Sequence, residues 1–204
     1  MKKLLLALAM FPMVAAANEL TPGTFELSGT TTLGFSSASS DVKMDGASVI
    51  KTDTSAFALG GNGLYYLTPN FALGGRVSYL NRTTKDKLNN TEFTDKDFFF
   101  GPAAQIEAHV APQVAVFGLL ALGYESSSLD FGGFSSDGSG VGLNLEAGVK
   151  YFPVKSLSFD AALAYDYASL KYDTVGGVTP KQTLSGFGFN LGLSVYFGGG
   201  DGHH

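Results

Sequence analysis

The sequence predicts an all-β fold, namely a closed, antiparallel, up-and-down barrel of eight strands that spans a membrane. First, apolar and polar residues alternate with a period of two in eight segments, as in strands that bury one face. Second, the less apolar face of these segments is rich in alanine and glycine. Third, charged residues make up only 15% of the 204 residues, whereas soluble domains average about 25%.

The first residues have the three parts of a secretory signal peptide. Two lysines precede an apolar run at residues 4–14, and three alanines follow it at the cleavage positions. The run is shorter than the roughly 20 residues that a helical membrane anchor, the alternative, requires. We therefore predict a signal peptide at residues 1–17, a barrel at 18–197 and a flexible tail at 198–204.

The eight alternating segments, in chain order, are residues 25–35, 57–67, 71–79, 98–110, 114–125, 141–152, 157–168 and 187–197. In the first, aromatic and aliphatic residues alternate with polar ones such as Glu26 and Ser28. In the second they alternate with small ones such as Ala58 and Gly60. The third places Arg76 opposite its apolar residues. Each pattern is typical of a strand with one apolar face.

The fourth segment sets Gln105, Glu107 and His109 opposite its apolar residues. It also contains Pro102, which has no backbone N–H to donate, so we expect a local bulge in the ladder there. The sixth, seventh and eighth segments alternate without interruption.

The fifth segment is apolar on both faces, so its alternation alone does not set its phase. Both phases stay open, and we assign the one in which Glu125 joins the polar face. The predicted apolar face then carries Val114, Val116, Leu120, Leu122 and Tyr124.

The connections between segments alternate between short and long. Tight turns are predicted at residues 68–70, 111–113 and 153–156. Their prolines recur at intervals of 43 and 41 residues, which indicates a repeated two-strand unit. Longer, polar connections are predicted near residues 36–54, 81–97, 126–139 and 169–185. This alternation puts both termini at the short-turn end of the barrel.

A barrel with one apolar face is either soluble with an apolar interior or embedded in a membrane with an apolar exterior. The small residues favour the second, because a water-facing surface would carry about 25–35% charged residues. Aromatic residues favour it as well, since they gather at both ends of the apolar face, like girdles at membrane interfaces. At the long-connection end they are Phe35, Phe57, Tyr79, Phe98, Tyr124, Tyr167 and Phe187. At the short-turn end they are Phe25, Tyr65, Phe71, Tyr151, Phe159 and Phe197.

Three stretches carry a resemblance to a known family: residues 66–75 (YLTPNFALGG), 117–124 (FGLLALGY) and 150–159 (KYFPVKSLSF). With the eight-strand pattern, they resemble the OmpA/OmpX-like small outer-membrane barrels of Gram-negative bacteria. Near the C-terminus, a set of residues is similar to the signal that the barrel-assembly machinery recognises in that family. These residues are Asn190, Gly192, Val195 and Phe197. The family usually stops at this aromatic residue, whereas this chain continues to His204.

The resemblance implies a monomer in the outer membrane of a Gram-negative bacterium, with both termini in the periplasm. The implied partners are outer-membrane lipid and lipopolysaccharide, the barrel-assembly machinery during insertion, and an unidentified surface ligand. The implied role is structural or in surface interaction of the adhesion type, as in OmpX-like proteins, and is not enzymatic. Two alternatives stay open: a narrow, porin-like ion channel and a lipid A-modifying enzyme.

The polar face carries ionisable residues that are expected to point into the lumen. They are Glu26, Arg76, Glu107, His109, Glu125, Glu146, Lys150, Asp160 and Asp166. Isolated buried charges are costly, and side chains fill the interior of an eight-stranded barrel. We therefore expect these groups to pair, Lys150 with Asp160 across a hairpin and Arg76 with Glu107 on the next strand. The alternative is a proton or ion path, in which the surplus of acids would favour cations.

No catalytic, metal or cofactor site is expected. Cysteine is absent, the histidines are His109, His203 and His204, and no G-x-S-x-G motif occurs. The formal net charge of −5 argues against a nucleic-acid partner, because such partners require a basic surface.

The long connections are the remaining functional surface, since binding residues concentrate on loops of rigid scaffolds. In residues 36–54 and 81–97 the charges are balanced in sign, which predicts solvation. The connection at 126–139 differs, because it contains Leu129, Phe131 and Phe134. Exposed apolar residues of this kind mark a contact with a partner or a membrane, or they pack on the barrel rim.

Overall fold

A computed structural model describes residues 20–32, 40–44, 47–86, 91–131, 134–172 and 181–198. The strands, in chain order, are β1 (Thr24–Thr32), β2 (Ser40–Met44), β3 (Ala47–Thr68), β4 (Phe71–Asp86), β5 (Thr91–Ala111), β6 (Val114–Phe131), β7 (Phe134–Val154), β8 (Leu157–Tyr172) and β9 (Lys181–Gly198). Within the described ranges, no helix has the length and hydropathy of a membrane-spanning segment. The predicted signal peptide, Phe35 and residues 199–204 lie outside these ranges.

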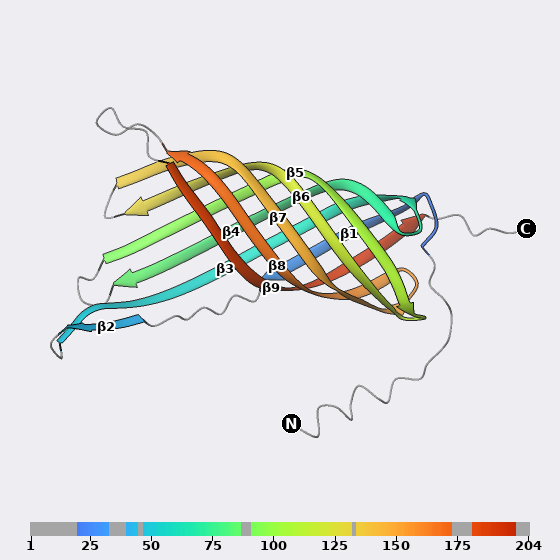
Figure 1. The fold of residues 1–204 in the computed structure, drawn as a ribbon, viewed down its shortest axis with the longest axis horizontal. Coiled ribbons are helices and arrows are strands. Elements are labelled where there is room, and N and C mark those ends of the chain that lie inside the picture. Colours follow the sequence, from blue (N-terminus) through green and yellow to red (C-terminus); the bar gives the residue numbers. More distant parts are fainter. Residues whose placement is uncertain are drawn as a thin grey trace, which may run out of the picture.

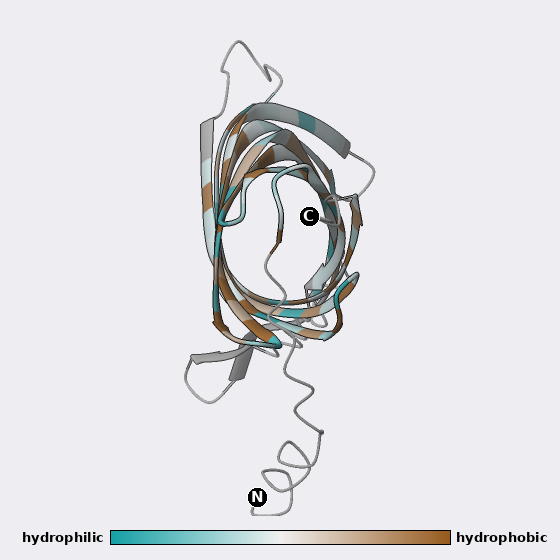
Figure 2. Ribbon diagram, turned by 90° about the vertical axis from the view of Figure 1, so that its right-hand side faces the viewer, coloured by the Kyte–Doolittle hydropathy of each residue, from teal (hydrophilic) through white to brown (hydrophobic). Residues whose placement is uncertain are grey.

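Eight of the strands form the predicted barrel. From β3 to β9, each strand pairs antiparallel with the next one in the chain, and β1 pairs with both β9 and β3. Figure 1 shows these strands side by side along the long axis, and Figure 2 shows them as a ring. Because β1 pairs with both β3 and β9, the ring is closed. The eight-stranded antiparallel barrel is therefore confirmed. The remaining strand, β2, pairs only with β3 and lies in a stretch predicted as a connection.

The strands are longer than predicted at the end opposite the tight turns. The ladder between β6 and β7 continues until Phe131 lies opposite Phe134, inside the predicted connection 126–139. The ladder between β4 and β5 likewise continues to Asp86 opposite Thr91. The prediction of long connections was therefore wrong at these hairpins. Backbone pairing does not require apolar side chains, so a ladder continues where the apolar pattern stops.

The three tight turns are confirmed as two-residue connections at residues 69–70, 112–113 and 155–156. The register of each hairpin shifts next to its turn, within residues 66–68, 109–111 and 151–154. The pairing of Phe25 with Tyr65 and with Phe197 places the start of β1 and the end of β9 at this same end of the barrel.

The bulge expected at Pro102 does not form. The β4–β5 ladder keeps one register through Pro102, and the β5–β6 ladder resumes in the same register after it. The two strands approach closely there: a Cβ on Gly101 would lie 2.1 Å from the carbonyl oxygen of Leu122, and one on Gly123 would lie 2.2 Å from that of Phe100. Glycine at both positions allows this approach, so the two strands stay close together next to Pro102.

The apolar face points away from the barrel axis. Leu145, Leu163 and Phe189 are exposed, and the residues between outward positions are mostly buried. On β6 the predicted phase is confirmed: Val114 is half-buried, while Val116, Leu120, Leu122 and Tyr124 are exposed. The inward residues of the same strand are buried, among them Ala115, Phe117, Leu119 and Ala121.

The aromatic residues at the two ends of the outward face lie side by side on neighbouring strands. At the short-turn end, Phe25 is paired with Phe197 on one side and Tyr65 on the other. At the other end, Tyr79 is paired with Phe98. All five side chains are exposed. The outer surface therefore has the apolar band and flanking aromatic girdles of a membrane-spanning barrel.

Candidate functional site in the barrel interior

Lys150 lies at the centre of a buried cluster in the short-turn half of the lumen. It is 1% exposed, and its Nζ is 2.5 Å from Glu26 Oε1 on β1 and 3.5 Å from Glu107 Oε2 on β5. The same ammonium donates a hydrogen bond to the Tyr196 hydroxyl at 2.9 Å. The rings of Phe117 and Tyr196 lie 5.2 and 5.4 Å from Nζ. Two carboxylates and two rings thus stabilise the buried charge.

Neutral side chains also contact the two carboxylates. The Tyr66 hydroxyl lies 2.8 Å from both Glu26 Oε2 and Glu107 Oε2. Gln105 donates from Nε2 to the Tyr66 hydroxyl at 2.8 Å and lies 3.1 Å from Glu26 Oε2. A network of this kind offsets the desolvation of its charges only when its members are satisfied together.

Asp160 lies opposite Lys150 in the β7–β8 register, as predicted. The ion pairs of Lys150, however, are with Glu26 and Glu107. Asp160 instead accepts hydrogen bonds from Ser158 Oγ at 2.6 Å and from Ser194 Oγ. Closure of the ring brings β1 and β5 to the lysine, and those strands supply its partners.

The expected pairing of Arg76 with Glu107 was wrong. Arg76 Nη2 lies 2.6 Å from Glu146 Oε1 on β7, across the lumen, and Nη1 donates to Asn62 Oδ1 at 3.1 Å. In the β4–β5 register, Arg76 is opposite Gly101, six residues before Glu107. At about 3.4 Å per residue, that is roughly 20 Å along the strand. The ion pair therefore forms with the acid at the same height in the barrel.

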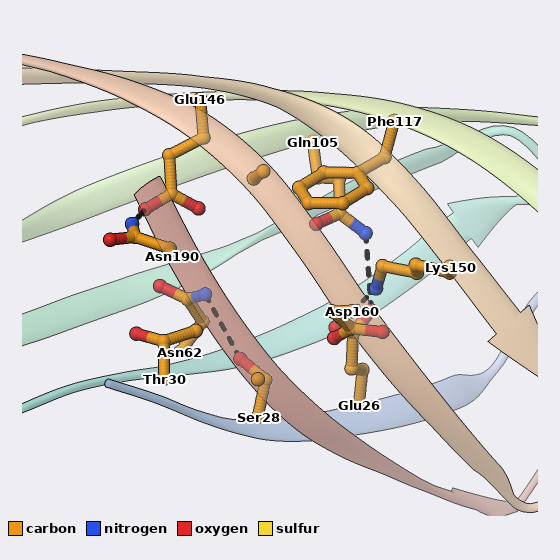
Figure 3. Close-up of a pocket in the computed structure, with 12 residues that line it drawn as sticks. Glu26, Ser28, Thr30, Asn62, Gln105, Phe117, Glu146, Lys150, Asp160 and Asn190 are labelled. Atoms are coloured by element: carbon orange, nitrogen blue, oxygen red, sulfur yellow. Dashed lines mark hydrogen bonds and ion pairs between the residues drawn. The ribbon is translucent and has the colours of Figure 1, made fainter. Parts of the chain in front are cut away.

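These side chains nearly fill the short-turn half of the lumen. Figure 3 shows Glu26, Gln105, Phe117, Lys150 and Asp160 converging there. The volume left among them is about 10 Å³, roughly what a single water molecule requires. Side chains therefore close the barrel at this level.

The other half of the lumen is hollow. A cavity of about 350 Å³ lies there, lined by Asp97, Glu125, Asn144 and Asp166 among others. Glu125 and Asp166 therefore belong to this cavity and not to the Lys150 cluster. Sequence reasoning missed Asp97, because the stretch 81–97 was assigned to a connection. Continuing the alternation of β5 by one more residue pair beyond Phe99 would have placed Asp97 inside.

Several uncharged residues of the network were also absent from the predicted lumen set. They are Ser28, Asn62, Tyr66, Gln105, Ser158, Ser194 and Tyr196. Alternation placed them on the polar face, and that was the signal that could have found them. Which of them join a cluster depends on which strands face each other across the lumen.

His109 is half-buried on the inward face of β5. Its Nε2 lies 3.5 Å from Glu107 Oε1, and its ring centroid is 5.3 Å from that of Phe152. Among the described residues, no group of His, Asp or Glu is arranged to hold a metal ion.

The residues of the predicted assembly signal lie on both faces of β9. Asn190 points inward and donates from Nδ2 to Glu146 Oε1 at 2.6 Å. Phe197 points outward and is exposed, Val195 is half-buried, and Gly192 lies against Thr30. Their role in assembly stays a prediction.

The predicted contact residues of the 126–139 stretch lie on the outer parts of β6 and β7. Leu129 is exposed. Phe131 and Phe134 are paired with each other at the tip of the hairpin, and their side chains lie outside the described part of the structure. Their role in contacts stays a prediction.

Comparisons with known proteins agree with this architecture. The family described as outer membrane protein beta-barrel domain matches residues 4–197. Among solved structures, OprG from Pseudomonas aeruginosa is 16% identical with a TM-score of 0.56, covering 90% of this chain and 100% of that one. Neisserial surface protein A is 19% identical with a TM-score of 0.53, covering 86% and 97%. Ail of Yersinia pestis, solved in complex with the heparin analogue sucrose octasulfate, is 18% identical with a TM-score of 0.50, covering 87% and 100%. The comparison with curated proteins found no match.

Proposed function

Because the chain belongs to the family of outer-membrane β-barrel proteins, we propose that it has a structural and surface-interaction role in that membrane and is not an enzyme. The observation that carries the proposal is the filled short-turn half of the lumen, where only about 10 Å³ stays open around Lys150. A barrel closed in this way is a rigid scaffold, and its binding residues are expected at its ends.

The extended hairpins supply the surface for such interactions. Beyond the aromatic girdle, β4–β5 and β5–β6 carry exposed ion pairs, Lys85 with Glu92 at 2.9 Å and Lys96 with Asp130 at 3.2 Å. Lipopolysaccharide, outer-membrane lipid and an unidentified surface ligand are the proposed partners, with the barrel-assembly machinery acting during insertion. Ail, a protein of similar fold, has been solved with a heparin analogue, which supports ligand binding by this architecture.

Two observations weigh against the alternative functions. The closed lumen opposes ion conduction. The only histidine among the described residues, His109, lies inside the barrel next to Glu107, whereas a lipid A-modifying site must face the bilayer. We further propose that the protein is a monomer. Its tight turns and both termini would lie in the periplasm, and its extended hairpins would lie at the cell surface.

Shortening the β6–β7 hairpin tests the surface role. Ser126 and Ser139 are direct partners, so residues 127–138 can be replaced by Asn-Gly, which favours a two-residue hairpin turn. We expect the variant to keep heat-modifiable mobility in electrophoresis while adhesion of expressing cells to a fixed epithelial monolayer falls to background. Replacing residues 82–95, between the partners Asn81 and Lys96, by the same turn shortens the β4–β5 hairpin and tests whether that hairpin contributes as well.

Two results would contradict the proposal. One is adhesion that is unchanged in both shortened variants and in a variant carrying both deletions. The other is a discrete single-channel conductance of the full-length chain in planar bilayers, which would favour the narrow channel.

A further inference from the structure

The hollow half of the lumen has the size of a ligand site. Its volume is about 350 Å³, and pockets that hold small organic molecules span about 300–1,000 Å³. Four of its polar lining residues lie on four consecutive strands, with Asp97 on β5, Glu125 on β6, Asn144 on β7 and Asp166 on β8. Asp166 is exposed, so the cavity communicates with solvent.

The lining has more negative than positive charge to offer a ligand. Among the described residues, Asp97, Glu125 and Asp166 take part in no ion pair. Two arginines also line the cavity. The guanidinium of Arg76 is held by Glu146 and Asn62, and that of Arg82, which is 43% exposed, lies 3.7 Å from Asp95. Both arginines thus lie next to other acids, and none of the three carboxylates forms an ion pair with a described residue.

Two buried oxygens in the cavity wall lack a hydrogen-bond donor within the described residues. They are Oδ1 of Asp97 and Oδ1 of Asn144, in residues that are 7% and 4% exposed. Asn144 donates from Nδ2 to Asp166 Oδ1 at 2.7 Å, so its carbonyl oxygen is left as a free acceptor. An unsatisfied buried acceptor costs about 1–3 kcal/mol. A ligand with several N–H donors would satisfy both oxygens.

An aromatic ring lies beside one of the carboxylates. Phe99 is buried and paired with Glu125 across β5 and β6. A Cβ on Gly142 would lie 2.4 Å from Glu125 Oε2 and 2.8 Å from Phe99 Cδ2. Glycine at this position therefore leaves room for both groups on the cavity wall. Carboxylates next to an aromatic ring are the chemistry that binds ammonium groups.

From these observations we infer that the hollow half of the lumen binds a small organic cation with more than one ammonium group, such as a linear aliphatic diamine. Asp97, Glu125 and Asp166 would hold the charges, and Asn144 Oδ1 would accept an N–H. Among the described residues no acidic group is arranged to hold a metal ion, so separated carboxylates favour an extended cation over a single metal ion.

Titration of the full chain, folded in zwitterionic micelles, tests the inference. The probe is 1,4-diaminobutane, followed by the amide NMR signals of Phe99, Gly142 and Asn144. Three further probes are 1,4-butanediol, which has the same shape without charge, succinate, which has the opposite charge, and Mg²⁺, all at equal ionic strength. We expect saturable shifts with the diamine only.

Three variants locate the binding site. Glu125→Gln and Asp166→Asn should each weaken diamine binding about tenfold, the loss of one charged contact. Asp137→Asn is the matched control, because it removes the same charge from an exposed position on β7, about 24 Å from Asn144 at about 3.4 Å per residue. Its affinity should stay within about twofold of the parent. If Glu125→Gln does not fold, as judged by loss of heat-modifiable mobility, Asp166→Asn still tests the inference, because Asp166 is exposed.

The inference is overturned by any of three results: no saturable shift with the diamine, equal binding of butanediol or Mg²⁺, or equal weakening by Asp137→Asn. The surface role proposed above does not depend on this site, so either outcome leaves that proposal standing.

Discussion

At the scale of single residues, Lys150 shows how an ammonium group is accommodated inside a membrane barrel. Burial of an unpaired charge costs several kcal/mol, and a buried pair remains stable only when further hydrogen bonds satisfy it. Here Glu26 and Glu107 flank the ammonium group, and Tyr196 accepts one of its hydrogen bonds. Removing the lysine leaves two carboxylates next to each other in a dry interior.

We therefore predict that Lys150→Met lowers the free energy of unfolding by about 3–5 kcal/mol. Urea-induced unfolding in detergent micelles measures the change. Adding Glu26→Gln to Lys150→Met should recover part of the loss, because one of the two unpaired acids is then neutral. Lys155→Met is the control, since Lys155 is exposed in the turn between β7 and β8 and should have little effect. Equal stability of Lys150→Met and the parent would show that the cluster does not stabilise the barrel.

At the scale of the elements, each strand meets two different requirements along its length. Between the girdles, outward residues must be apolar because they face lipid. Beyond the girdles this requirement ends, and the ladders of β4–β5 and β6–β7 continue with polar residues. The last strand, β9, has an additional predicted requirement at its end, where Phe197 is part of the assembly signal.

Phe197→Ala separates assembly from stability. Phe197 and Phe187 both point outward on β9, with exposures of 52% and 88%, but Phe187 lies at the opposite girdle. If the end of β9 is recognised during insertion, Phe197→Ala lowers the heat-modifiable fraction in cell membranes severalfold, and Phe187→Ala does not. Refolding of the purified chains in micelles should give similar yields for both. A similar loss in cells for both variants would mean that lost apolar area, not recognition, is responsible.

At the scale of the whole molecule, the barrel has a filled end and a hollow end. The tight turns, the start of β1 and the end of β9 lie at the filled end, where Lys150 is buried. The extended hairpins lie at the hollow end, above the cavity lined by Asp97 and Glu125. This polarity matches the proposed orientation, in which the filled end faces the periplasm.

Cysteine labelling tests the orientation directly, because the natural chain has no cysteine. Ser135→Cys places a thiol at an exposed position near the tip of the β6–β7 hairpin, and Ser156→Cys places one in the tight turn between β7 and β8. In intact cells, a membrane-impermeant maleimide should label the cysteine at 135 and not the one at 156. Permeabilised cells, in which both should be labelled, provide the control. Labelling of position 156 in intact cells would reverse the proposed topology.

Much of the architecture was predictable because it follows from local alternation. The period of two defined the ring of eight strands, and the outward positions of Leu145, Leu163 and Phe189 followed from the small residues of the other face. The phase assigned to β6 from Glu125 agrees with the burial of its side chains, although its alternation alone left the phase open. Each of these inferences needs only the alternating direction of side chains along a strand.

The contacts inside the lumen depended on the tertiary structure. Arg76 pairs with Glu146 across the barrel, and Lys150 pairs with Glu26, which is 124 residues away in the chain. Alternation determines that these side chains point inward, but the stagger and closure of the strands determine which of them meet at one height. The same geometry decides where the lumen is filled and where it is hollow. Local alternation is therefore enough to predict the faces and the order of the strands, whereas the partners inside the lumen follow only from the closed ring.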